Sequence, residues 1–186
     1  NNSVYTNYNA RLSLETPAYL RDKLGFEFTS EEDELIDNFN AIGADMFIVF
    51  DEERQFHPQF EDFDIEAVNL TIKQSDVVLL GYPLMMPMTE EVRTNDLVIY
   101  EGLTDTHGPD TGTWSMHTVG WLELGDPDKA GDMFSVMFRN INGPFKIFSE
   151  KPADAEDGMR ATNFITGMGG MLQAVVFGYA GIRVRT

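Results

Sequence analysis

Residues 72–81 read Ile-Lys-Gln-Ser-Asp-Val-Val-Leu-Leu-Gly, so the pair Lys73-Gln74 stands directly before an apolar run. Such a run predicts burial, and two polar groups beside it serve either packing or a polar ligand. An isolated buried lysine costs several kcal/mol, so a buried pair requires nearby acids or a hydroxyl-rich ligand. These ten residues alone leave both interpretations open.

Length and composition indicate one domain with a sizeable core, because the chain has 186 residues and 42% of them are hydrophobic. Its 31 acidic and 13 basic residues give a net charge of -18, which we interpret as a solvated surface. Without a Lys/Arg stripe to contact phosphates, we expect no nucleic-acid partner. There are no cysteines, and the three histidines lack metal-ligand spacing, so we expect no disulfide, no metal and no cofactor.

No membrane segment or signal peptide is visible. The longest apolar run, residues 77–88, is interrupted by glycine and prolines and is shorter than the roughly 20 residues that span a bilayer. We expect a soluble protein with no membrane partner, and we favour the cytoplasm over secretion. The chain begins at Asn1-Asn2 without an initiator Met, so we expect a fragment or a processed product.

Hydrophobic spacing predicts a mainly α fold, in which antiparallel helices lead into a short β segment. Thr16-Pro17 indicates the start of a helix that ends at Gly25, and Ser30 with Asp33 indicates the cap of a second helix. The other helices are predicted over residues 75–80, 90–101, 113–124, 127–138 and 161–177. β-like runs are predicted over residues 46–50 and 181–186.

Two functional patterns lack the context that they require: a serine–histidine catalytic pair and a glycine-rich dinucleotide-binding motif. Ser115 and His117 lie too close on one helix to face each other as a nucleophile and its base. Residues 167–170 contain a Gly-x-Gly-Gly motif, but no predicted strand precedes it, so we interpret these glycines as sites of close helix packing.

Carboxylates remain as candidates for chemistry. Glu150 ends the alternating run of residues 145–149 and can project into a cleft, although most such acids are merely solvated. The nearby tryptophans, Trp114 and Trp121, either stack on a sugar or belong to the core. The residues by themselves therefore indicate a helical domain with a polar-ligand cleft as one option.

Four sequence blocks occur together and in order. They are residues 1–7 (Asn-Asn-Ser-Val-Tyr-Thr-Asn), 59–63 (Gln-Phe-Glu-Asp-Phe), 72–78 (Ile-Lys-Gln-Ser-Asp-Val-Val) and 167–178 (Gly-Met-Gly-Gly-Met-Leu-Gln-Ala-Val-Val-Phe-Gly). In this order they resemble glycoside hydrolase family 65, and its glucosidase branch is the most similar. The resemblance covers essentially the whole chain.

The resemblance implies a fold and an activity. Residues 1–180 would form the C-terminal part of an (α/α)6 catalytic barrel, a helical toroid, and residues 181–186 would begin a C-terminal β domain or a linker. The implied activity is an inverting α-glucoside hydrolase acting on a carbohydrate substrate, glucosyl-galactosyl-hydroxylysine or an α-linked disaccharide. The family's general acid would lie before Asn1, in a missing N-terminal part of the same chain, so this chain alone would be inactive.

The same resemblance implies the roles of individual residues. Glu150 would be the general base, with Glu156 and Asp157 as alternatives because the following segment is longer and more acidic than in the family. Lys73 and Gln74 would hold the glucose hydroxyls.

The remaining substrate-binding candidates are Trp114 and Asn163. Asn163 and the glycines after it occupy the region that binds phosphate in the family's phosphorylases. No Ser or Thr follows Gly170, which favours water as the nucleophile. A disaccharide phosphorylase using inorganic phosphate and an inactive carbohydrate-binding fragment are the alternatives.

Overall fold

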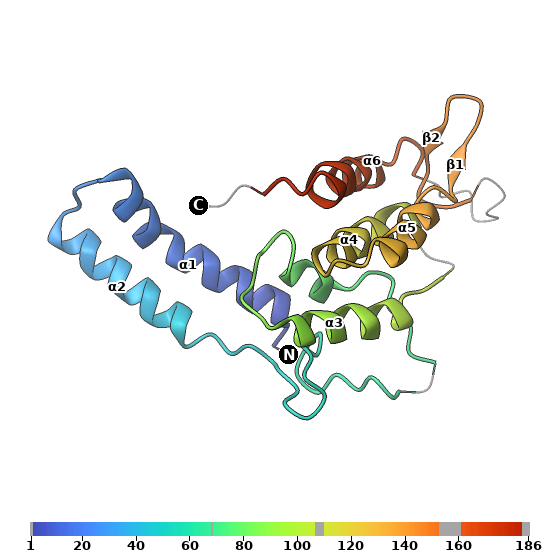
Figure 1. Ribbon diagram of the computed structural model, residues 1–186. Helices are drawn as coiled ribbons and strands as arrows, with labels where there is room; N and C mark the ends of the chain where they lie inside the picture. Colours follow the sequence, from blue (N-terminus) through green and yellow to red (C-terminus); the bar gives the residue numbers. More distant parts are fainter. Residues whose placement is uncertain (1, 68, 107–109, 153–160, 184–186) are drawn as a thin grey trace. The chain divides into compact units, whose positions relative to one another are not determined.

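The computed structural model describes residues 2–67, 69–106, 110–152 and 161–183. These residues are mainly helical, as the sequence predicts, and they include a small two-stranded sheet (Figure 1). The chain divides into two compact units, residues 1–64 and residues 65–186. In the described parts of the chain, no helix combines the length and hydrophobicity needed to cross a membrane.

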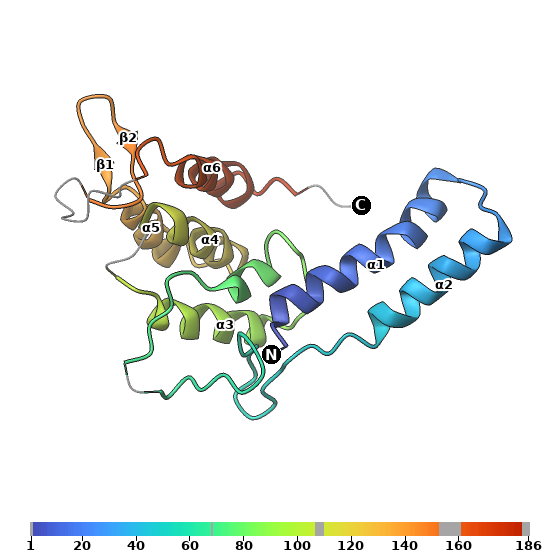
Figure 2. The ribbon, with the colours of Figure 1, turned by 180° about the vertical axis from the view of Figure 1, so that it is seen from behind.

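The first unit is a hairpin of two helices, α1 (Val4–Leu24) and α2 (Ser30–Ala44) (Figure 2). The Ser3 hydroxyl caps α1 by accepting a hydrogen bond from the Thr6 N–H at 3.4 Å. Gly25 ends α1 in the left-handed conformation, with φ at 65°, which glycine adopts without steric cost.

Both predicted helix starts in this unit are wrong. α1 begins far upstream of Thr16, and Pro17 lies inside it. The proline is tolerated because the carbonyl that loses its partner belongs to Ser13, which is exposed to solvent. α2 is capped one residue earlier than predicted, by Thr29 and Glu32, which exchange hydrogen bonds in a capping box.

The β-like run predicted over residues 46–50 forms no strand. The carbonyl of Phe47 accepts a hydrogen bond from the Asn7 side chain at 2.7 Å instead. A side chain of α1 therefore satisfies a backbone group that a partner strand would otherwise bind.

The described residues of the second unit form six helical elements and a β-hairpin. They are the 3-10 helix η1 (Asp76–Leu80), α3 (Glu90–Leu103), α4 (Asp110–Glu123), α5 (Pro127–Val136), β1 (Ile141–Asn142), β2 (Ile147–Phe148) and α6 (Ile165–Gln173), which continues as the π-helix η2 (Ala174–Tyr179). The helices predicted over residues 90–101, 113–124 and 127–138 are confirmed. The helix predicted over residues 161–177 starts later than predicted, at Ile165.

Helix α4 is the central element of this unit, because it packs against α5, α6 and η2. A buried cluster of Tyr82, Trp114, Val119, Met137 and Ala174 joins these elements. Burial of such apolar surface is the main favourable term that holds the unit together.

Close approach of α4 and α6 depends on a glycine. A Cβ added at Gly170 would lie 2.4 Å from the Ser115 hydroxyl oxygen, far inside van der Waals contact. The interpretation as a packing residue is therefore confirmed for Gly170, but it is wrong for Gly169, where an added Cβ would meet nothing within 4 Å.

Beyond η2, residues 181–183 form no strand, and residues 184–186 lie outside the described residues. The β domain or linker expected over residues 181–186 stays a prediction.

Candidate functional site

The pair Lys73-Gln74 is exposed, so the premise that both side chains are buried is wrong. Burial begins on either side of the pair, at Ile72 and Ser75, which are each 8% exposed. Ile72 is fixed by a bridge with Thr104, and the Ser75 hydroxyl caps η1. The pair thus occupies a short solvent-facing segment between two anchored residues, where a lysine pays no desolvation penalty.

Lys73 contacts Glu150 although the two residues lie 77 positions apart in the chain. Its Nζ lies 3.2 Å from the Glu150 Oε1, and the two side chains are 64% and 23% exposed. Thr113 of α4 donates its hydroxyl to the Lys73 carbonyl at 3.3 Å. The fold therefore brings together a predicted glucose-binding residue and the predicted general base.

The β1–β2 hairpin positions Glu150. The Glu150 N–H donates to the Ala161 carbonyl at 3.1 Å, and the Glu150 carbonyl accepts from the Asn140 amide at 2.8 Å. The preceding residue, Ser149, is fully buried. The backbone is thus held on both sides while the carboxylate stays accessible. The alternative bases, Glu156 and Asp157, lie outside the described residues.

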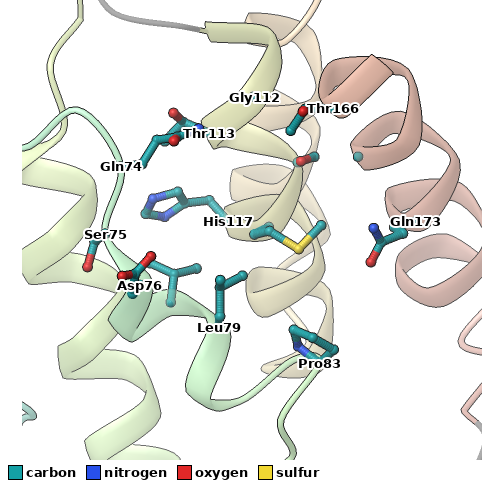
Figure 3. Close-up of a pocket in the computed structure, with 14 residues that line it drawn as sticks. Gln74, Ser75, Asp76, Leu79, Pro83, Gly112, Thr113, His117, Thr166 and Gln173 are labelled. Atoms are coloured by element: carbon teal, nitrogen blue, oxygen red, sulfur yellow. The ribbon is translucent and has the colours of Figure 1, made fainter. Parts of the chain in front are cut away.

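A cavity of about 360 Å³ opens next to Gln74, with walls from η1, α4 and α6 (Figure 3). We call it the α4–α6 cavity. Its polar lining includes Gln74, Asp76, Thr113, Ser115, His117 and Gln173. A Cβ added at Gly112 would lie 3.0 Å from the Gln74 Nε2, so this glycine leaves room for the amide at the cavity.

His117 lies in the wall of this cavity and is only 1% exposed (Figure 3). Neither ring nitrogen has a hydrogen-bond partner among the described residues. Burial, together with a smaller contribution from the nearby Arg93 guanidinium, lowers the pKa of His117 to about 3. The imidazole is therefore neutral at physiological pH, with one N–H donor and one acceptor nitrogen.

Two other polar residues shape the cavity. Partial burial raises the pKa of the Asp76 carboxyl at the start of η1. Gln173 of α6 accepts a hydrogen bond from the Tyr82 hydroxyl at 3.0 Å, which orients its amide.

Trp114 and Trp121 both belong to the core, one of the two interpretations that the sequence left open. Trp114 is 6% exposed and its ring centroid lies 5.2 Å from that of His117. Trp121 is 3% exposed and donates its indole N–H to Glu101 at 2.9 Å. A contact between Trp114 and a substrate stays a prediction.

Asn163 is exposed just before α6, in the left-handed conformation with φ at 57°. It is not among the residues that line the α4–α6 cavity. Its predicted part in substrate binding also stays a prediction. Among the described residues, no group of three His, Asp or Glu side chains is placed to hold a metal ion.

Sequence reasoning missed His117 as a site residue, because it considered only metal ligation and a serine nucleophile. One signal was available: Thr113 and His117 lie four residues apart, so they share a face of α4. That this face meets α6 across a cavity depends on tertiary packing, which no local pattern encodes.

Comparisons with known proteins identify the family, although no family model matches the chain. The chain is 43% identical to the protein-glucosylgalactosylhydroxylysine glucosidase of Danio rerio over 184 residues, which cover 99% of this chain and 26% of that protein. This identity, together with the four ordered blocks, decides the question. The chain belongs to glycoside hydrolase family 65.

More distant relatives also resemble this family 65 chain. It is 33% identical to the kojibiose hydrolase of Mucilaginibacter mallensis over 116 residues, which cover 61% of this chain and 16% of that protein. A solved structure, a candidate kojibiose phosphorylase from the human microbiome, matches with a TM-score of 0.64 at 17% identity and covers 99% of this chain and 30% of its own. That likeness shows the fold alone. The family 65 chain spans about a quarter of the length of its curated glucosidase relatives.

Proposed function

We propose that this chain forms part of an inverting α-glucoside hydrolase in which Glu150 is the general base. The observation that carries the proposal is the contact at 3.2 Å between Lys73 and Glu150, from segments distant in sequence. Glucosidase and hydrolase relatives support release of glucose from a glucoside, either glucosyl-galactosyl-hydroxylysine or an α-linked disaccharide. The TM-score of 0.64 to a family structure supports placing these helices in an (α/α)6 barrel.

In this proposal Glu150 takes a proton from a water molecule. The water oxygen attacks the anomeric carbon, the bond from that carbon to the leaving oxygen breaks, and a carboxylic acid protonates the leaving oxygen from the opposite face. The acid belongs to a part of the longer protein that this sequence does not include. Roughly 6.5–9.5 Å between the two carboxyl groups leaves room for the water.

The surroundings of Glu150 suit this role. Its backbone is fixed by Asn140 and Ala161, and its carboxylate is about a quarter exposed, so water reaches it. The Lys73 ammonium, which is more exposed, orients the carboxylate and can also donate to a sugar hydroxyl. Gln74 offers its amide to the same sugar from the α4–α6 cavity.

Grafting this chain into the matching span of the Danio rerio relative tests the proposal. Circular dichroism establishes that the graft folds, and free glucose released from glucosylgalactosylhydroxylysine is then measured. We expect release without added phosphate, and we expect Glu150→Gln to slow it about 10²- to 10⁴-fold. The control is Glu34→Gln, which changes an exposed acid of α2 and should leave the rate unchanged.

Three outcomes would contradict the proposal. Full activity of Glu150→Gln would remove the assigned base. Turnover that requires phosphate and yields glucose 1-phosphate would indicate a phosphorylase. Binding of glucose by a folded graft that releases none would indicate an inactive carbohydrate-binding protein.

A further inference from the structure

His117 is an unusual core residue, because burial has removed both ring nitrogens from water without giving either a partner among the described residues. Buried polar atoms in folded proteins are nearly always hydrogen-bonded, and an exception calls for an explanation. A histidine kept only for packing is readily replaced by an apolar residue of the same size at no such cost. The two unpaired nitrogens therefore mark His117 as a candidate binding residue.

The charge around His117 limits what that use can be. Burial disfavours the charged imidazolium, and the positive charge of Arg93, which is 5% exposed, disfavours it further, so the imidazole stays neutral. A neutral imidazole donates one hydrogen bond and accepts another. A hydroxyl group does the same, whereas a carboxylate or phosphate can only accept.

The cavity beside His117 has matching chemistry. Its volume of about 360 Å³ falls within the range of small-molecule sites. The polar groups on its walls are mostly uncharged amides and hydroxyls, from Gln74, Thr113, Ser115 and Gln173. Leu79 and Pro83 supply apolar wall, which suits the C–H faces of a sugar ring.

We propose that the α4–α6 cavity binds an uncharged sugar ring and that His117 hydrogen-bonds one of its hydroxyl groups. The proposal rests on the proposed function for the class of ligand, and it adds His117 to the residues that bind it. His117 takes no part in bond cleavage; it selects a ligand that carries a hydroxyl group at that position. A ligand without that hydroxyl leaves the imidazole unsatisfied and binds more weakly.

Glucose affinity and unfolding temperature, measured together on this chain, test the proposal. We expect glucose to bind by calorimetry, and His117→Leu to weaken it about tenfold while the unfolding temperature stays equal or rises. His117→Gln, whose amide restores a donor and an acceptor, should recover part of the affinity. His57→Leu is the matched control: His57 is 4% exposed and packs on Phe50, so its loss should lower the unfolding temperature and leave the affinity unchanged.

Three results would overturn the inference. In the first, wild-type protein binds no glucose. In the second, His117→Leu binds glucose normally and unfolds at a lower temperature, so the histidine is structural. In the third, each member of a deoxyglucose series binds as tightly as glucose. A water molecule rather than a ligand hydroxyl would then form the hydrogen bonds of the His117 imidazole. A failure of the proposed function can be distinguished from a failure of this inference. In that case the graft would bind glucose through His117 but would release no glucose from the substrate.

Discussion

The neighbours Lys73 and Gln74 serve two regions that differ in charge and burial. On one side, the Lys73–Glu150 pair is charged and partly exposed. On the other, the α4–α6 cavity next to Gln74 is lined mostly by uncharged groups and includes the buried, neutral His117. The difference follows from desolvation, because ions are costly to bury and neutral hydrogen-bonding groups are less so.

This contrast suggests a division of labour. A general base has to be ionised and reachable by water, so the exposed pair suits chemistry. A binding residue gains strength and selectivity from a low-dielectric environment, so the cavity suits recognition. Changes in the two regions should therefore have different signatures.

The largest effect on stability should come from the cavity, through the pH dependence of His117. Its pKa of about 3 in the folded state lies below the ordinary value of 6.5 in the unfolded chain. Between those values the unfolded state binds the proton and the folded state does not, so stability falls as the pH drops below 6.5. At pH 5 the loss is about 2 kcal/mol relative to pH 7.5.

Urea unfolding at the two pH values measures this loss in the wild type and in His117→Leu. The wild type should lose about 2 kcal/mol more than the variant, since the leucine binds no proton. Equal losses in both proteins would mean that His117 titrates normally and that the cavity is not a dry, neutral region.

The second prediction concerns the packing that shapes the cavity. Gly170→Ala should destabilise the protein by about 1–3 kcal/mol, because its Cβ would collide with the Ser115 side chain. Gly169→Ala meets nothing within 4 Å and should stabilise the protein by roughly 0.5–1 kcal/mol through reduced backbone entropy. Chemical denaturation measures the free energy of unfolding of both variants. Equal changes in the two variants would show that α4 and α6 are not closely packed at Gly170.

The smallest effect should come from the charged pair. Lys73→Met should change the free energy of unfolding by less than about 1 kcal/mol, because the lysine side chain is 64% exposed and such pairs contribute little. The measurement is urea unfolding at neutral pH with and without added salt. A loss larger than about 2 kcal/mol would indicate that the pair holds the fold together rather than serving chemistry.

The sequence predicts the parts of this molecule that local patterns encode. Apolar spacing locates the helices around residues 90–101 and 127–138, whose first turns are capped by the side chains of Thr89 and Asp126. It misplaces the start of α1, because Pro17 was interpreted as a first-turn proline although an exposed helix interior tolerates it. The π-helical end of α6 was not predicted either, since its geometry depends on packing against α4.

The sequence predicts which residues belong to the candidate site, but it does not predict how they are arranged in space. Resemblance names Lys73, Gln74 and Glu150, yet neither their contact nor their exposure follows from local sequence. The contact requires that the hairpin before Glu150 folds back toward the segment before η1. His117 escaped prediction because its orphaned nitrogens exist only once α4, α6 and η1 enclose them.

The division between chemistry and recognition is tested most directly by steady-state glucose release from the Danio rerio graft, with Glu150→Gln and Gln74→Leu compared side by side. The account predicts that Glu150→Gln lowers kcat about 10²- to 10⁴-fold and leaves KM nearly unchanged. Gln74→Leu should instead raise KM about tenfold with a much smaller change in kcat. The opposite split, or equal losses of kcat in both variants, would contradict it.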